Sequence, residues 1–160
     1  MKFKIKKTTD KDKEWLLEIV RGWGADFIVS RGRKIYPTEI ESYYAEDDSG
    51  KKLGLISFEI RGDQCEIVTL DAFEKFRGVG TVLLKEVVDE VRQRGCKRLW
   101  LITINDNLDA LRFYQRRGFT IAKVHVNSLQ KSRKIKPEIP SVGQYGIPLR
   151  DEIEFEMLLD

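Results

Sequence analysis

One glycine-containing segment lies between an expected strand and an expected helix, where a chain can bind a charged ligand. It reads Lys75-Phe76-Arg77-Gly78-Val79-Gly80-Thr81-Val82. Glycines let the backbone approach a ligand without a Cβ in the way, and the unpaired N–H groups of a first helical turn attract anions. The segment therefore predicts an anion site suited to a pyrophosphate, although a plain tight strand-to-helix turn also explains Gly-x-Gly.

Two common nucleotide-binding patterns do not fit this segment. Leu83 stands where a dinucleotide fingerprint would have its third glycine, and the preceding strand is expected to follow a three-stranded meander. The Gly-Lys-Ser/Thr ending of a P-loop is also missing. We therefore expect neither a Rossmann dinucleotide site nor nucleotide hydrolysis.

A second segment follows the strongest expected helix and a buried strand. It reads Asn107-Leu108-Asp109-Ala110-Leu111-Arg112-Phe113-Tyr114-Gln115-Arg116-Arg117-Gly118-Phe119. Together the two segments resemble the GNAT superfamily of N-acetyltransferases, and their separation along the chain matches as well. The family pattern Gln/Arg-x-x-Gly-x-Gly/Ala falls on Lys75 to Gly80, with lysine where the family prefers Gln or Arg. The pattern Asn-x-x-Ala, x-x-Tyr, Gly-Phe falls on Asn107, Ala110, Tyr114, Gly118 and Phe119.

The resemblance implies that acetyl-CoA is the cosubstrate and that a primary amine of a small molecule or peptide attacks its thioester directly. In this family the pantetheine arm lies between two splayed parallel strands, and the helix start binds the pyrophosphate. The implied cofactor-binding residues are Leu70, Lys75, Arg77, Gly78, Val79, Gly80, Thr81, Val82, Asn107 and Tyr114. The backbone of Leu70 takes the place that meets the pantetheine amide. The alternative function is a non-catalytic GNAT-fold module that senses CoA or binds a partner.

Tyr114 and Glu66 are the expected catalytic residues. An alkyl amine has a pKa of about 10 in solution, so it must lose a proton before attack, and the departing thiolate needs a proton or a stabilising group. The resemblance gives Tyr114 the second role; without it, Tyr114 is a half-buried packing residue. Glu66 shares strand parity with Leu70, which predicts a base facing the ligand, or it is a paired surface carboxylate. Asp71 is the runner-up, and His125 is expected to be structural.

An aperiodic stretch over residues 25–36 is expected to be a loop above the acceptor side of the site. Trp23, Ser30, Arg31, Arg33 and Tyr36 lie in it or beside it. An arginine there could bind a carboxylate of the acceptor as a bidentate pair, or it could be a solvated loop charge.

The hydrophobic pattern predicts the elements that position these residues. Alternating or continuous apolar residues predict strands at 2–7, 43–46, 53–60, 65–70, 99–104, 119–126 and 152–158. Apolar residues at helical spacing predict helices near 15–23, at 80–94 and at 107–117, and Pro37 begins a short helix. The fold class is therefore α/β (α+β): a mixed, mostly antiparallel central sheet of about seven strands with helices on both faces. The resemblance places a splayed parallel pair in the middle of the sheet.

The composition favours one ordinary folded domain. The chain has 160 residues, of which 41% are hydrophobic and 34% charged, so residues 1–160 can form a single domain with its own core. A net charge of +3 demands no nucleic-acid partner. A basic cluster is nevertheless present, at Lys131, Arg133, Lys134 and Lys136.

The sequence also predicts where the protein is located and how it could assemble. No apolar run is long enough to span a membrane and no signal peptide is visible, so we expect no membrane partner and a cytoplasmic protein. Cys65 and Cys96 are too few and too unpatterned for disulfides or a metal site, and we expect reduced, buried thiols. The exposed edge at 119–126 could pair two copies as a homodimer.

Overall fold

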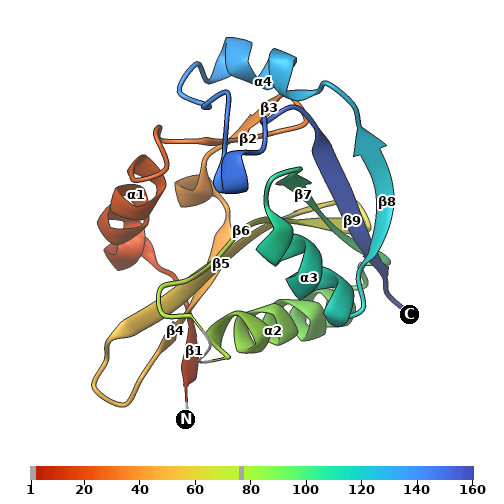
Figure 1. Ribbon diagram of the computed structural model, residues 1–160. Coiled ribbons are helices and arrows are strands. Elements are labelled where there is room, and N and C mark those ends of the chain that lie inside the picture. The colour runs from red at the N-terminus through yellow and green to blue at the C-terminus, as the bar shows by residue number, and fades with distance from the viewer. Residues whose placement is uncertain (1–2, 76–77) are drawn as a thin grey trace.

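The structure is a computed structural model, and it describes residues 3–75 and 78–160. Its main sheet has seven strands in the order β1-β4-β5-β6-β7-β9-β8 (Figure 1). In that order they are β1 (Lys4–Lys7), β4 (Glu41–Glu46), β5 (Lys52–Arg61), β6 (Gln64–Ala72), β7 (Arg98–Ile104), β9 (Glu152–Leu158) and β8 (Thr120–His125). Among the strands that the structure describes, only β6 and β7 pair in parallel. The predicted mixed, mostly antiparallel sheet with a central parallel pair is confirmed.

Helices cover both faces of this sheet, as predicted. They are α1 (Lys13–Arg21), α2 (Val79–Gln93), α3 (Leu108–Arg116) and α4 (Leu129–Ile135), with 3-10 turns at Asp10–Asp12, Pro37–Glu39 and Gln144–Gly146. Two neighbouring tyrosines of β4 point to opposite faces of the sheet. Tyr43 stacks on Phe58 in the core under α2, with 5.7 Å between ring centroids. Tyr44 points the other way, to Trp15 of α1, at 5.8 Å.

The start of α2 is held close to the sheet. The apolar face of this helix, including Leu83, Val87 and Val91, is fully buried in the main core. At Gly54 of β5, an added Cβ would come within 2.7 Å of the Val79 side chain. Only glycine therefore allows the first turn of α2 to lie so near the strands, which fixes this helix start relative to the end of β6.

The parallel pair separates halfway along its length. Pairing runs from Gln64 and Arg98 to Ile67 and Leu101, whereas β6 continues to residue 72 and β7 to residue 104. The carboxyl ends of the two strands are therefore not hydrogen-bonded to each other. This agrees with the splayed pair that the resemblance implies.

A β-bulge at Val68 changes which face the later residues of β6 occupy. Thr69 and Ile67 pair with consecutive residues of β5, so Val68 is an extra residue in the strand. Such an insertion shifts the alternation of side chains. Ile67 and Leu70 consequently both pack on the core under α2, while Glu66 lies on the opposite face. The expectation that Glu66 and Leu70 share a face is wrong for this reason.

Residues 25–36 contain a hairpin rather than the expected loop. Its strands are β2 (Ile28–Ser30) and β3 (Arg33–Ile35). Arg31 and Gly32 at the turn have φ of 51° and 73°, and a two-residue turn of type I′ needs positive φ at both positions. Strands of three residues carry too little periodicity to be predicted. Ser30 and Arg33 contact Glu66, so the hairpin covers the face of the sheet opposite α2.

The predicted basic cluster lies on and after α4, a helix that the sequence pattern did not indicate. Arg133 donates to the carbonyl oxygens of Pro140 and Leu149 at 2.8 and 2.6 Å. Lys136 is largely buried, and desolvation lowers the pKa of its ammonium group. Arg133 of this cluster thus holds the chain that follows α4.

Three further expectations concern thiols, the sheet edge and membranes. Cys65 and Cys96 are free and buried, as predicted. The edge strand β8 exposes Ile121 (48%) and Val124 (47%), and Val126 just beyond it is 63% exposed. Within residues 3–75 and 78–160, no helix is both long and apolar enough to cross a bilayer.

Candidate functional site

A cleft of about 580 Å³ opens between the start of α2, the end of β6 and one side of α3. Most residues expected to bind the cofactor line it: Leu70, Lys75, Gly78, Val79, Gly80, Thr81, Asn107 and Tyr114. Arg77 lies outside the described residues. The two segments singled out in the sequence thus form walls of one cleft.

The wall formed by α2 begins with a residue in the left-handed conformation, followed by amides that have no hydrogen-bond partner in the part of the chain that the structure describes. Gly78 is the N-cap, with φ of 77° and ψ of 8°, a conformation that favours glycine. The N–H groups of Val79, Gly80 and Thr81 belong to the first turn, where no helical carbonyl is available to them. Such a helix start attracts anions. Val82 differs from these three residues, because its N–H donates to the Gly78 carbonyl at 3.1 Å and it does not line the cleft.

The wall formed by α3 carries a cap and a buried tyrosine. Asn107 caps this helix, because its Oδ1 accepts the N–H of Ala110 at 3.1 Å. Tyr114 is 7% exposed, and its ring packs edge-on against Phe113 and Phe119 at centroid distances of 5.1 and 5.4 Å. Burial raises the pKa of the Tyr114 hydroxyl well above its ordinary value. The hydroxyl therefore stays protonated at neutral pH and can donate a proton to an anion that forms beside it.

Arg117 joins the two walls, a contact that sequence reasoning missed. Its Nε donates to Thr81 Oγ1 at 3.0 Å, and its Nη1 donates to the Phe113 carbonyl at 3.0 Å. The guanidinium carbon lies 3.8 Å from the centroid of the Phe113 ring. The same ring lies 3.4 Å from the position that a Cβ at Gly80 would take. The sequence signal for the contact between Phe113 and Arg117 is their spacing of four residues, which brings two side chains together on one face of a helix.

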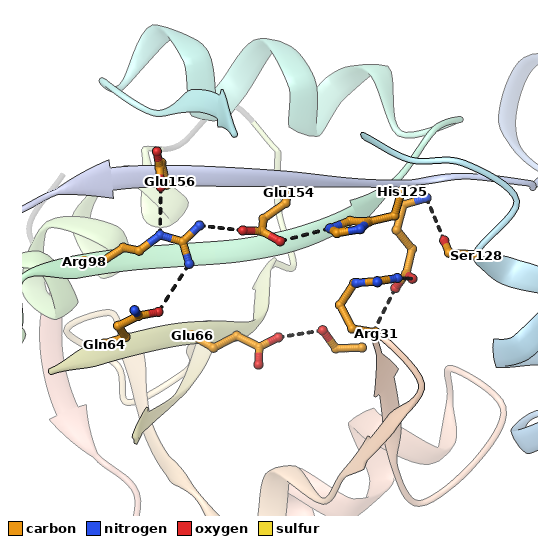
Figure 2. A network of polar contacts seen from close by, with 10 residues as sticks. Arg31, Gln64, Glu66, Arg98, His125, Ser128, Glu154 and Glu156 are labelled. Atoms are coloured by element: carbon orange, nitrogen blue, oxygen red, sulfur yellow. Dashed lines mark hydrogen bonds and ion pairs between the residues drawn. The ribbon is translucent and has the colours of Figure 1, made fainter. Parts of the chain in front are cut away.

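Glu66 lies on the other face of the sheet, under the hairpin. Its Oε2 accepts a hydrogen bond from Ser30 Oγ at 2.7 Å, and its Oε1 accepts one from Arg33 Nη2 at 2.9 Å. Figure 2 shows the carboxylate pointing toward the hairpin. Arg33 also donates to Glu59 at 2.9 Å. Burial raises the pKa of Glu66, and the contacts with Ser30 and Arg33 offset this only in part. A carboxylate with a raised pKa is a stronger base while it is ionised.

Further ion pairs hold the strands and the hairpin turn on this face (Figure 2). Arg98 of β7 donates to Glu154 of β9, which also contacts His125 Nε2 at 2.9 Å. Glu152 is 2% exposed and accepts from the Arg31 backbone N–H at 3.1 Å and from its guanidinium at 3.3 Å. His125 contacts Glu154 of the neighbouring strand β9 and lies on the edge strand β8, which β7 and β9 separate from β6, so its position agrees with a structural role.

The residues expected above the acceptor side make more contacts with other residues of the protein than the sequence suggested. Both arginines of the hairpin contact glutamates of the sheet instead of standing free in solvent. Tyr36 packs against Phe27, with 5.8 Å between ring centroids, and Trp23 is 37% exposed. Asp71, the runner-up for the base, pairs with Leu55 and so shares the face of Glu66; desolvation raises its pKa.

Comparison with known proteins agrees with this arrangement. The sequence profile described as "Acetyltransferase (GNAT) family" matches residues 13–119. The chain is 43% identical over 122 residues to the uncharacterized protein YdhI of Bacillus subtilis, covering 76% of each chain. It is 40% identical over 133 residues to the uncharacterized protein YxbD of the same organism, covering 82% of each. This chain belongs to the GNAT acetyltransferase family.

Solved structures share the fold along nearly the whole chain. A structure titled IAA acetyltransferase from Bacillus cereus superposes with a TM-score of 0.75 at 22% identity, covering 99% of this chain and all of the other. A GNAT family acetyltransferase from Elizabethkingia anophelis, solved with acetyl-CoA bound, gives a TM-score of 0.71 at 24% identity and covers 98% of each chain. At these identities the likeness concerns the fold.

Proposed function

We propose that this protein transfers an acetyl group from acetyl-CoA to a primary amine of a small molecule or peptide. The observation that carries the proposal is the cleft between α2 and α3, where a buried, protonated tyrosine borders the same space as a helix start whose first-turn N–H groups have no hydrogen-bond partner among the described residues. The acetyl-CoA bound to the Elizabethkingia relative supports the same ligand here.

Each wall of the cleft has a proposed role in binding. The first-turn N–H groups of Val79, Gly80 and Thr81 bind the pyrophosphate, since a helix N-terminus and unpaired amides favour an anion. Lys75 adds a positive charge beside them. The backbone of Leu70, beyond the point where β6 and β7 stop pairing, is free to hydrogen-bond the pantetheine arm.

Two side chains are proposed to move protons during transfer. The amine first loses a proton to Glu66, directly or through water, because only a neutral nitrogen has a lone pair for attack. The nitrogen then bonds to the thioester carbonyl carbon and releases its second proton to water as the carbon–sulfur bond breaks, which leaves a neutral amide. Tyr114 gives its proton to the departing thiolate and regains one from solvent. The raised pKa of Glu66 makes its carboxylate a stronger base, and the raised pKa of Tyr114 keeps the hydroxyl protonated until the thiolate forms.

A non-catalytic module that only senses CoA would need the same phosphate-binding helix start. It would have no use for a proton donor buried at the inner end of the cleft or for a base under the hairpin. Tyr114 and Glu66 therefore favour the enzyme.

Acetyl transfer to a panel of amines tests the proposal. The panel holds a polyamine, free amino acids, an antibiotic amine and a peptide with a free N-terminus, and release of the CoA thiol is measured together with product mass. We expect thiol release that depends on at least one amine and yields its acetylated form. Binding of acetyl-CoA without transfer to any class would favour the sensing module instead.

We also propose that the exposed edge of β8 pairs with β8 of a second copy. An unpaired edge strand with exposed Ile121 and Val124 is a template for such pairing. A dimer mass in solution that reverts to monomer in Val124→Lys supports this interface, and a monomer mass for the parent protein contradicts it.

A further inference from the structure

Arg117 is held by three contacts although it pairs with no carboxylate among the described residues. Its contacts are the Thr81 hydroxyl, the Phe113 carbonyl and the face of the Phe113 ring. A guanidinium has five N–H donors, and these two bonds use one on Nε and one on Nη1. The remaining donors stay on a cation whose position is already fixed, so little conformational entropy is lost when it binds an anion.

The cleft around Arg117 carries an excess of positive charge. Its described lining contains four cationic side chains, Lys75, Arg112, Arg116 and Arg117, against two carboxylates, Glu74 and Asp109. Asp109 contacts Arg112 at 3.4 Å, which partly neutralises that arginine. Arg117 combines a fixed position with a charge that no described carboxylate neutralises.

The contact with Thr81 places Arg117 beside the first turn of α2. Thr81 lies in the turn whose N–H groups are proposed to hold the pyrophosphate, and Arg117 Nε is 3.0 Å from its hydroxyl. In CoA the pyrophosphate is followed by the ribose, which carries the 3′-phosphate. A phosphate that is one ribose away from the helix start therefore comes within reach of this guanidinium. Arginine binds such a dianion through two parallel N–H bonds.

We propose that Arg117 is a specificity-determining residue that binds the 3′-phosphate of CoA and selects the 3′-phosphorylated cofactor over 3′-dephospho-CoA. The proposal rests on the proposed function, because it requires CoA in this cleft. The competing role for Arg117 is purely structural, as a contact that only joins α3 to α2. Such a contact would affect the affinities for CoA and 3′-dephospho-CoA equally, so the ratio of the two affinities separates the two roles.

The experiment measures dissociation constants for CoA and for 3′-dephospho-CoA by calorimetry. The proteins are the parent, Arg117→Gln, Arg117→Lys and the control Lys85→Gln. Lys85 lies on α2 outside the cleft lining and is 77% exposed in its side chain, so its loss changes the net charge equally without touching the site. We expect the parent and the control to bind CoA about 10- to 100-fold more tightly than the dephospho form.

In Arg117→Gln we expect this preference to fall to about onefold, with the affinity for dephospho-CoA nearly unchanged. Arg117→Lys keeps the charge but not the planar fork, and should retain an intermediate preference. Equal affinities of the parent for the two ligands, or an unchanged ratio in Arg117→Gln, would overturn the proposal. So would an equal weakening of both ligands. Failure of the parent to bind either ligand would instead refute the proposed function.

Discussion

Replacing Tyr114 by phenylalanine is expected to slow acetyl transfer by about 10²- to 10⁴-fold in a single-turnover assay, while the affinity for CoA changes little. The substitution deletes only the hydroxyl, and the ring can keep its contacts with Phe113 and Phe119. Without a proton donor the departing thiolate is left unprotonated in the buried end of the cleft. The loss should therefore appear in kcat and not in CoA binding.

A second tyrosine provides the matched control for this variant. Tyr44 is buried to a similar degree, 8% exposed against 7% for Tyr114, but faces Trp15 of α1 on the other side of the sheet. Tyr44→Phe should transfer acetyl at the parent rate. If Tyr114→Phe also transfers at the parent rate while binding CoA normally, Tyr114 is a packing residue and acts on no proton.

The second large effect is expected from Glu66→Gln, again about 10²- to 10⁴-fold in the rate of transfer. Glutamine keeps the shape of the side chain but cannot accept a proton from the amine. The pH dependence gives a separate readout. In the parent the rate should fall as pH drops through the raised pKa of Glu66, because only the ionised carboxylate is a base. In Glu66→Gln this acid limb should disappear.

The control for Glu66 is the neighbouring glutamate that shares its arginine. Glu59 accepts from Arg33 at 2.9 Å but lies one strand further from β7. Glu59→Gln should leave both the rate and the acid limb nearly unchanged. A Glu66→Gln enzyme with the parent rate and pH profile would exclude Glu66 as the base. Loss of the acid limb in Asp71→Asn instead would assign the base to Asp71.

Elements with a long, regular period could be predicted from the sequence. The apolar residues of α2 recur at helical spacing, and those of β7 form a nearly continuous run, so both elements and the strand–helix–strand unit that contains them were expected. The two motif segments indicated that Gly80 and Tyr114 would meet in one site. The cleft brings them together because Gly54 lets α2 lie close to the strands and because β6 and β7 stop pairing halfway.

What the sequence could not reveal depends on single residues or on contacts distant in the chain. The bulge at Val68 adds one residue to a strand, and no local pattern marks it, yet it moves Glu66 to the face opposite Leu70. The hairpin at residues 28–35 is held by side chains such as Ser30 that reach glutamates far along the chain. The bond from Arg117 to a hydroxyl on α2 likewise depends on how two helices pack.

The position of the cofactor can be tested by one added side chain. In Gly80→Val, the Cβ would lie 3.4 Å from the Phe113 ring, and the two methyl groups beyond it would occupy the approach to the first turn of α2. Valine has a better helix propensity than the glycine it replaces, so the helix itself is not weakened and the variant should remain folded. It should nevertheless fail to bind CoA.

The thermal shift caused by CoA tests the central claim most directly. A ligand that binds only the native state at a hundredfold excess over its Kd stabilises it by about 2.7 kcal/mol, which raises the Tm of a chain of this size by about 5 to 10 °C. We predict this rise for the parent with CoA or acetyl-CoA, no rise with NAD, and no rise in folded Gly80→Val. An unchanged Tm of the parent at millimolar CoA would contradict the account.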